Sequence, residues 1–256
     1  MNQPQNIIHF VGAGPGDPEL ITVKGRRLLE AADLVVYTGS LVPGELLQGL
    51  HAETHDSSGL TLEQVIELLA AAWRAGKKVV RLHTGDPAIY GAIGEQMARL
   101  AELGIPWRVV PGVSSATAAA AALSAELTLP EISQSVIITR RAGRTPVPER
   151  ENLPALASHQ ATMLILLSAG MVAEVAAELI SGGYPPSTPA AVVEKASWPE
   201  ERIVRGTLED ITAKTTAAGI TKTAIIAVGR VLAAAPPPVL SKLYDPEFTH
   251  GYRNGS

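Results

Sequence analysis

The sequence predicts an α/β protein of two domains, each with a mainly parallel sheet. Three observations support this prediction. Short apolar runs alternate with helical patterns along the chain, which is typical of parallel strands connected by helices. Two glycine-rich segments, 12–18 and 84–91, each follow an apolar run and precede a helical pattern. The chain has 256 residues, 46% of them hydrophobic, enough to bury one large core or two small ones.

In the first half, apolar runs predict buried strands at 7–11, 34–37, 79–82 and 107–110. Helical spacing predicts helices at 19–32, 61–75, 91–103 and 114–123. Asp17 followed by Pro18 is a typical helix start. Thr61 and Gln64 have the spacing of a capping box, and Ser114 is the expected cap of the fourth helix.

The second half repeats the alternation of strands and helices. Strands are expected at 136–139, 163–167, 190–194 and 224–228, with an added antiparallel strand at 203–205, and helices at 171–180 and 208–218. The mixed segment 125–135 is interpreted as a linker between a domain at 1–124 and a domain at 136–235. Three prolines at 236–238 end the fold, and the polar tail at 236–256 is expected to be mobile.

Composition excludes several functional classes. A net charge of −4 and an aromatic content of 4% do not suit a nucleic-acid binder. The absence of cysteine excludes disulfides, thiolate metal sites and cysteine nucleophiles, and it is consistent with the cytoplasm. We find no signal peptide and no apolar run long enough for a membrane span. A soluble cytoplasmic protein without a membrane partner is expected.

Familiar glycine motifs do not match either loop. The first loop lacks the spacing of a dinucleotide fingerprint, and no acid follows the second strand to hold a ribose. Lys24 and Gly25 stand in the wrong order for a Walker loop. Ser114 and Ser115 lack the final glycine of a nucleophile elbow. A nicotinamide oxidoreductase therefore remains only an alternative.

Other candidate residues allow more than one interpretation. His51 and His55 have the spacing of two metal ligands on a helix, but we interpret them as loop residues and expect no metal site. Asp86 before Pro87 is either a helix cap or part of a ligand loop. The role of His83 stays open. A cluster of arginines after the strand at 136–139 is either solvated or recognises substrate carboxylates; it contains Arg140, Arg141 and Arg144.

Segments 11–25, 83–91 and 110–115 together resemble the signatures of the tetrapyrrole (corrin/porphyrin) methyltransferase family, and the resemblance continues through 193–199 to Gly229. Within the family, stretches 37–42, 83–87, 139–148 and 195–199 are most similar to the subgroup that methylates precorrin-4 at C11. Uroporphyrinogen-III methylases differ in having a second glycine where Thr84 stands.

The resemblance implies a homodimer that binds S-adenosylmethionine in the cleft between its two domains and releases S-adenosylhomocysteine. The implied cofactor contacts are Pro15, Thr84, Gly85, Asp86, Ile89, Ser114, Ser115, Ser168, Ala196 and Ala224. At Ser168 a backbone contact is expected, because related methylases have methionine there. The implied tetrapyrrole contacts are Gly14, Arg140, Arg141 and Arg144, with Arg26 and Arg27 as further candidates for its carboxylates.

The resemblance also implies direct methyl transfer to a ring carbon of the tetrapyrrole precorrin-4, without a metal or a covalent enzyme intermediate. Asp86 and His83 are near the site in sequence, but no catalytic residue is assigned. Three alternatives remain open: a sister methylase acting on cobalt-precorrin-4 or at another ring position, a non-catalytic tetrapyrrole carrier, and the nicotinamide oxidoreductase considered above.

Overall fold

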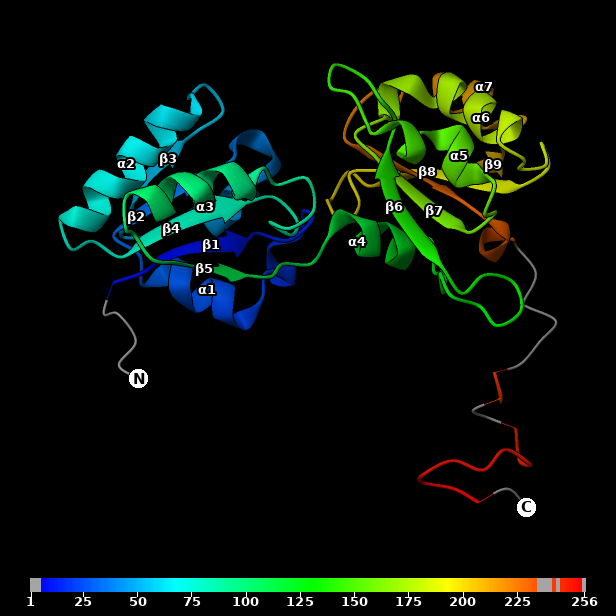
Figure 1. Ribbon diagram of the computed structural model, residues 1–256, viewed down its shortest axis with the longest axis horizontal. Helices are drawn as coiled ribbons and strands as arrows, with labels where there is room; N and C mark the ends of the chain where they lie inside the picture. The colour runs from blue at the N-terminus through cyan, green and yellow to red at the C-terminus, as the bar shows by residue number, and fades with distance from the viewer. Residues whose placement is uncertain (1–5, 234–240, 243–244, 255–256) are drawn as a thin grey trace. The chain divides into compact units, whose positions relative to one another are not determined.

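The structure is a computed structural model that describes residues 6–233, 241–242 and 245–254 (Figure 1). The chain forms two compact units. Unit 1 takes the residues up to Ala118 together with Ala196–Glu200, and unit 2 takes the others. Part of the tail at 236–256, for which mobility is expected, lies outside the described residues. Each unit has its own sheet and helices, which confirms the predicted α/β class.

Unit 1 contains a five-stranded sheet in which every neighbouring pair is parallel, in the order β3-β2-β4-β1-β5. Its strands are β1 (Ile8–Gly12), β2 (Leu34–Tyr37), β3 (Glu53–Asp56), β4 (Val79–His83) and β5 (Trp107–Val110). Strand β3 was not expected, because its four polar residues make an edge strand without an apolar run. His55 therefore lies in a strand rather than in a loop, with Nε2 2.7 Å from Glu53 Oε1.

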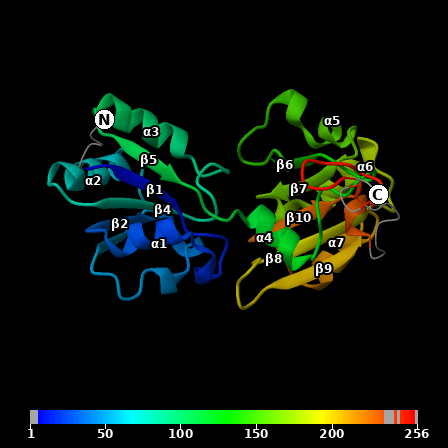
Figure 2. The ribbon, with the colours of Figure 1, turned by 90° about the horizontal axis from the view of Figure 1, so that it is seen from below.

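Helices cover both faces of this sheet: α2 (Leu62–Arg74) and α3 (Ile93–Glu102) lie on one face and α1 (Val23–Glu30) on the other (Figures 1 and 2). The alternation of side chains along a strand explains this arrangement. Ile8 and Phe10 contact the residues of α2 and α3, whereas Val11 packs in the cluster that includes Leu29 of α1. Along each of these strands, alternate side chains therefore belong to the core on one face of the sheet or to the core on the other.

Two predicted helices begin later than expected. The first is split into the short 3-10 helix η1 (Pro18–Leu20) and α1, because Ile21 is extended and the side chain of Thr22 caps α1 by accepting from Gly25 N. Helix α3 begins at Ile93, because Tyr90 and Ala92 have positive φ angles that interrupt a helix. By contrast, the capping box of Thr61 and Gln64 is present at the start of α2.

Two further 3-10 turns follow β2, namely η2 (Gly39–Leu41) and η3 (Gly44–Leu46). Helix α4 (Ser115–Ala122) follows β5, and Ser114 Oγ accepts from Ala116 N at 3.2 Å at its start. Its first residues group with unit 1 and those from Ala119 onward with unit 2. Helix α4 is therefore the segment along which the chain passes from unit 1 into unit 2.

The sheet of unit 2 has the order β6-β7-β10-β8-β9. Its strands are β6 (Val136–Arg140), β7 (Thr162–Leu166), β8 (Pro189–Glu194), β9 (Arg202–Thr207) and β10 (Ala224–Val228). Only the β6–β7 pair is parallel, so the expectation of a mainly parallel sheet is wrong for this unit. The connection between β8 and β9 is too short for a parallel crossover. The added antiparallel strand expected at 203–205 is confirmed as part of β9.

Helices α5 (Leu153–Ala157), α6 (Val172–Ser181) and α7 (Ile211–Ala217) contribute to one core with β7, β8 and β10. The short turns η4 (Glu149–Glu151), η5 (Ala169–Met171) and η6 (Arg230–Leu232) complete the unit. Helix α5 was not predicted; it is short, and its start depends on Asn152, whose side chain accepts from Ala155 N at 2.8 Å. The predicted helices at 171–180 and 208–218 correspond to α6 and α7.

Candidate functional site

Three loops of unit 1 meet at one edge of the parallel sheet. They follow β1, β4 and β5, and β1 is the neighbour of both other strands. Since the carboxyl ends of parallel strands lie at the same edge, the loops that begin at Ala13, Thr84 and Pro111 are brought together there. The three segments that look most unusual in the sequence are thus neighbours in the structure.

The first and second loops are joined by their backbones. Gly14 and Gly85 form an isolated antiparallel bridge, in which Gly85 N donates to Gly14 O at 2.8 Å and Gly14 N donates to Gly85 O at 3.3 Å. Ala13 N also donates to His83 O at 2.7 Å. Both glycines have positive φ angles, a conformation that side-chain-bearing residues rarely adopt. The bridge fixes the two loops against each other.

Asp86 connects the second loop to the third. Its Oδ1 accepts from Ala88 N at 2.8 Å within the loop, and its Oδ2 accepts from Gly112 N at 3.0 Å across the loops. No helix begins at Ala88, so Asp86 holds a turn rather than capping α3. Bonds from backbone amides to a carboxylate are stronger than neutral ones, and Asp86 is therefore the main polar link at this edge.

Glycine is required where the strand ends approach one another. A Cβ atom at Gly12 would lie 2.6 Å from both the Cα of Gly112 and the carbonyl oxygen of Gly85. A Cβ atom at Gly112 would lie 2.8 Å from the Cα of Gly12 and still closer to the same carbonyl. Because all of these neighbours are backbone atoms, they cannot rotate away. The contact between the loops therefore depends on the absence of side chains at both positions.

Segment 196–200 of unit 1 holds the other side of the first loop. Trp198 Nε1 donates to Pro15 O at 2.8 Å, and Asp17 N donates to Ser197 Oγ at 3.0 Å. The indole ring occupies the space that a side chain at Gly16 would need. The resemblance pointed to this segment, but it gave no role to Trp198 or Ser197. No spacing rule pairs a tryptophan with a loop more than 180 residues earlier.

His83 and Arg81 lie buried on the face of β4 that carries α2 and α3. The His83 ring stacks on Phe10 with ring centroids 5.9 Å apart, and within the described part of the chain its Nε2 has no hydrogen-bond partner. Burial, and the nearby Arg81, lower the pKa of His83 to about 3. Arg81 donates to Gln96 Oε1 at 3.1 Å and to Val36 O at 3.2 Å. His83 is therefore a neutral core residue at the base of the second loop.

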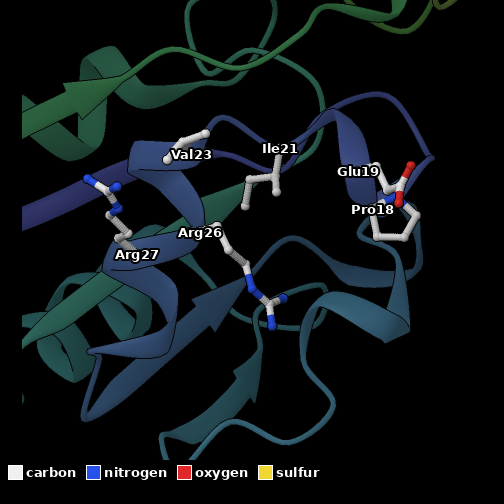
Figure 3. Close-up of a pocket in the computed structure, with 6 residues that line it drawn as sticks. All are labelled: Pro18, Glu19, Ile21, Val23, Arg26 and Arg27. Atoms are coloured by element: carbon white, nitrogen blue, oxygen red, sulfur yellow. The ribbon is translucent and has the colours of Figure 1, made fainter.

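A hollow of about 370 Å³ opens beside the first loop (Figure 3). Ile21 lies in its middle, with Pro18 and Glu19 toward one end and Arg27 at the other. Val23 and Arg26 complete the lining. These residues belong to η1, to α1 and to the turn between them.

In unit 2, a second group of predicted residues lies at one edge of the mixed sheet. Arg140 at the end of β6 pairs with Leu166 at the end of β7, and Ser168 follows shortly after. Ala224 begins β10, which is antiparallel to β7 and starts at that edge. Ser168 is fully buried, and its hydroxyl accepts from Arg141 N at 3.0 Å and donates to Leu166 O at 2.8 Å.

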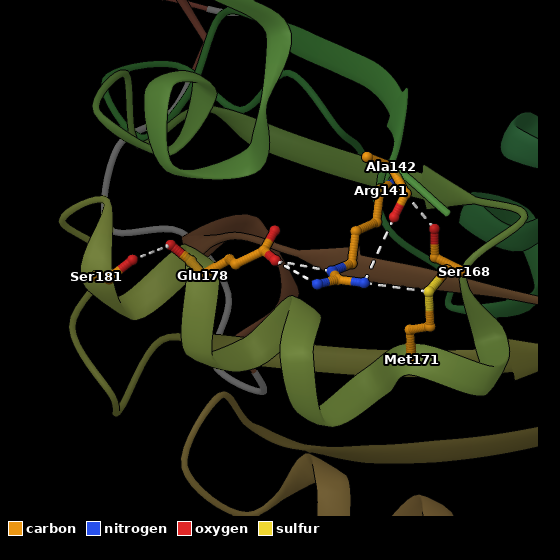
Figure 4. A network of polar contacts seen from close by, with 6 residues as sticks. All are labelled: Arg141, Ala142, Ser168, Met171, Glu178 and Ser181. Atoms are coloured by element: carbon orange, nitrogen blue, oxygen red, sulfur yellow. Dashed lines mark hydrogen bonds and ion pairs between the residues drawn. The ribbon is translucent and has the colours of Figure 1, made fainter. Parts of the chain in front are cut away.

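Two arginines of the predicted substrate cluster have partners within unit 2. The Arg141 guanidinium pairs with Glu178 Oε1 at 2.7 Å and contacts Met171 Sδ at 3.3 Å (Figure 4). Arg140 donates to Thr145 O at 3.1 Å and to Pro146 O at 2.6 Å. Arg144 is exposed and makes no hydrogen bond or ion pair with another described residue.

The predicted site residues thus fall into two groups. Those placed in unit 1 are Gly14, Pro15, Thr84, Gly85, Asp86, Ile89, Ser114, Ser115 and Ala196, and those placed in unit 2 are Arg140, Arg141, Arg144, Ser168 and Ala224. Within the described ranges no group of three or more histidine or acidic residues is arranged to hold a metal ion. None of the helices in those ranges combines the length and the hydropathy of a membrane-crossing segment.

Known proteins are similar to this chain along nearly its whole length. Residues 7–212 match the family model of the tetrapyrrole (corrin/porphyrin) methylases. A cobalt-precorrin-4 C(11)-methyltransferase of Methanocaldococcus jannaschii is 56% identical over 99% of this chain and 98% of its own length. A precorrin-4 C(11)-methyltransferase of Pseudomonas aeruginosa is 51% identical over 97% of this chain and 99% of its own.

Two solved structures extend the comparison. The crystal structure of a cobalt precorrin-4 methyltransferase, described as a cobalamin biosynthetic enzyme, has a TM-score of 0.87 and 47% identity, and the match covers 90% of this chain and 97% of that one. A uroporphyrin-III C-methyltransferase from Thermus thermophilus, complexed with S-adenosylhomocysteine, has a TM-score of 0.75 and 33% identity. That match covers 89% of this chain and 99% of the other.

We predict that Gly112→Ala will lower the free energy of unfolding by about 1–3 kcal/mol, because the added Cβ must displace backbone atoms of the neighbouring loops. Urea unfolding measures the change. Gly59→Ala is the matched control, since nothing lies within 4 Å of a Cβ at that position and its φ angle is not positive. Equal stability of the two variants would show that the loops are not tightly apposed.

We also predict that His83 makes the protein acid-sensitive. The folded ring stays neutral down to about pH 3, whereas the unfolded ring binds a proton below about pH 6.5, so stability falls as the pH drops through this window. The slope from this group is about 1.4 kcal/mol for each pH unit.

Urea unfolding of His83→Phe and of the wild type between pH 7 and pH 4.5 tests this contribution. This range covers about two of the pH units over which His83 is expected to lower stability. Phenylalanine keeps a ring against Phe10, removes the unpaired nitrogen and cannot be protonated. The variant is expected to lose less stability on acidification, while His51→Gln, at an exposed site, follows the wild type. Parallel curves for all three proteins would disprove the assignment.

Proposed function

The chain belongs to the tetrapyrrole (corrin/porphyrin) methylases, and on this basis we propose that it transfers the methyl group of S-adenosylmethionine to C11 of precorrin-4, forming precorrin-5 and S-adenosylhomocysteine in cobalamin biosynthesis. The observation that carries the proposal is the convergence of the three signature loops, joined by Gly14, Gly85 and Asp86, in a chain that matches C11-methyltransferases over nearly its whole length. A nicotinamide oxidoreductase explains neither finding, and the labelling experiment described below separates the methyltransferase from a carrier.

The second loop has the features needed to hold the methyl donor. A Cβ at Gly85 would have only Ser115 N within 4 Å, so the space beside this residue is open between the second and third loops. Backbone amides and carbonyls fixed there by Asp86 are suited to the polar groups of S-adenosylmethionine. The proposed contacts in unit 1 are Pro15, Thr84, Gly85, Asp86, Ile89, Ser114, Ser115 and Ala196.

In unit 2 we propose Ser168 and Ala224 as further contacts to the donor. Both lie at the edge of the mixed sheet where β7 ends and β10 begins. The hydroxyl of Ser168 is already bonded to Arg141 N and Leu166 O, which supports a contact through its backbone.

The donor supplies an electrophilic methyl group on a sulfonium, and the protein's task is alignment. The rigid loops hold one reactant in a fixed position relative to the other. Orienting two bound reactants can lower the barrier by up to about 7–11 kcal/mol. The bridge between Gly14 and Gly85 serves this purpose, because it joins the proposed tetrapyrrole side of the site to the proposed donor side.

Neither Asp86 nor His83 is arranged as a general base. Both oxygens of the Asp86 carboxylate accept from backbone amides. His83 is buried, with a pKa of about 3, and a proton taken from the substrate would be poorly stabilised on its ring. The chain's contribution at this edge is binding and orientation.

The substrate carries acetate and propionate groups, for which arginine is the natural partner. Gly14 and Arg144 are proposed contacts to the tetrapyrrole, and Arg144 is exposed with no bond to another described residue. Arg140 and Arg141 are proposed contacts as well. Their guanidinium groups also bond to the loop at 141–146 and to Glu178, which supports an additional role in positioning Arg144. We further propose that the protein works as a cytoplasmic homodimer.

The activity is tested by incubating the protein with S-adenosylmethionine labelled in its methyl group and with precorrin-4 or cobalt-precorrin-4 in separate reactions. Both substrates are included because similar relatives carry either name. We expect the label at C11 of one product, identified by mass spectrometry and NMR. A folded protein that labels neither substrate would contradict the proposal.

The role of Asp86 is tested by calorimetry with S-adenosylhomocysteine. In Asp86→Ala, two backbone amides lose a charged acceptor, so we expect the dissociation constant to rise roughly 10–100-fold. Asp33→Ala is the control, because Asp33 Oδ2 accepts from Lys78 N at 2.7 Å, next to the start of β4 and so at the other end of that strand. An unchanged affinity in folded Asp86→Ala would remove Asp86 from the donor site.

A further inference from the structure

The hollow beside the first glycine loop combines apolar walls with positive charge. Ile21 and Val23 form the apolar part, and Val23 is unusually exposed for its type, with 69% of its surface accessible. Arg26 and Arg27 contribute two guanidinium groups. Such a lining suits an anionic group carried on an apolar body.

The charge in this hollow is available for a ligand. Arg27 is exposed and makes no side-chain hydrogen bond or ion pair with another described residue. Arg26 pairs with Glu30 at 2.7 Å, but both side chains are more than a third exposed, so the pair is weak and easily exchanged. Glu19, the acid of the lining, lies at the end opposite Arg27 (Figure 3). An anion bound beside Arg27 therefore avoids Glu19.

The hollow is directly connected to the signature loops. A Cβ at Gly14 would lie 3.0 Å from Leu20 O and 3.5 Å from Ile21 N, so the backbone of Gly14 rests against the segment that lines the hollow. Gly14 is in turn bridged to Gly85. A group bound against Ile21 is thus held by the same rigid element as the proposed methyl-transfer site.

We propose that this hollow is a subsite for a carboxylate side chain of the tetrapyrrole. Arg27 pairs with the carboxylate, and Ile21 and Val23 contact the carbon atoms that carry it. Arg26, whose guanidinium group points to another side of the hollow in Figure 3, adds positive charge nearby. The assignment rests on the proposed function, because it takes the tetrapyrrole as the ligand. It also gives the substrate a cationic contact in unit 1, whereas the arginines at 140–144 lie in unit 2.

The test compares Arg26→Gln and Arg27→Gln with Arg74→Gln, an exposed arginine at the end of α2 that makes no ion pair with another described residue. With precorrin-4 as substrate, we expect Arg27→Gln to raise KM roughly 10-fold, the loss of one charge-assisted contact, and Arg26→Gln to raise KM by a smaller factor. The value of kcat and the dissociation constant of S-adenosylhomocysteine should change less than about twofold. Arg74→Gln should match the wild type.

A binding measurement separates this inference from the activity itself. Uroporphyrin, a stable polycarboxylated tetrapyrrole, is titrated into each protein and followed by its fluorescence. Weaker binding to Arg27→Gln than to Arg74→Gln supports the subsite even if precorrin-4 is not methylated, in which case only the proposed function fails. An active enzyme whose Arg26 and Arg27 variants keep the KM and uroporphyrin affinity of Arg74→Gln would overturn the inference.

Discussion

The structure depends on the close approach of three strand ends in the parallel sheet. Gly12 and Gly112 allow the backbones to touch, and the bridge between Gly14 and Gly85 then fixes two of the loops. Asp86 completes the arrangement by accepting a hydrogen bond from Gly112 N in the third loop. The bridge and the Asp86 bond depend on these glycines, because a side chain at Gly12 or Gly112 would separate the loops and remove the geometry of the Asp86 bond. A site whose main task is orientation needs this rigidity.

Charge is distributed differently in the two units. In unit 2, Arg141 is partly buried and bound to Glu178 and Met171, so it stabilises local structure instead of standing free. In unit 1, Arg27 makes no such bond to another described residue and lies beside an apolar hollow. From the sequence we predicted the arginines at 140–144 as substrate contacts and named Arg26 and Arg27 only as further candidates, because sequence does not show which guanidinium groups have partners. Their surroundings determine which of them remains available to an anionic ligand.

Local chemistry explains what could be predicted from the sequence. The capping box of α2 and the strands with apolar runs were recognised because their signals lie within a few residues. Strand β3 was missed because it is polar and pairs on one edge only, and the mixed sheet was misjudged because strand direction depends on how distant segments pair. The contact of Trp198 with Pro15 spans 183 positions, beyond any local rule. The resemblance supplied the signature residues, but not the bonds that join them.

Unit 1 is discontinuous in sequence, and this has a consequence for biosynthesis on the ribosome. Residues up to Ala118 emerge first, yet the indole that braces Pro15 belongs to Trp198, 80 residues later. At ordinary elongation rates the delay is on the order of 4–16 s. During that interval the first loop lacks its brace, and a shortened polypeptide ending near Ala118 would lack it permanently.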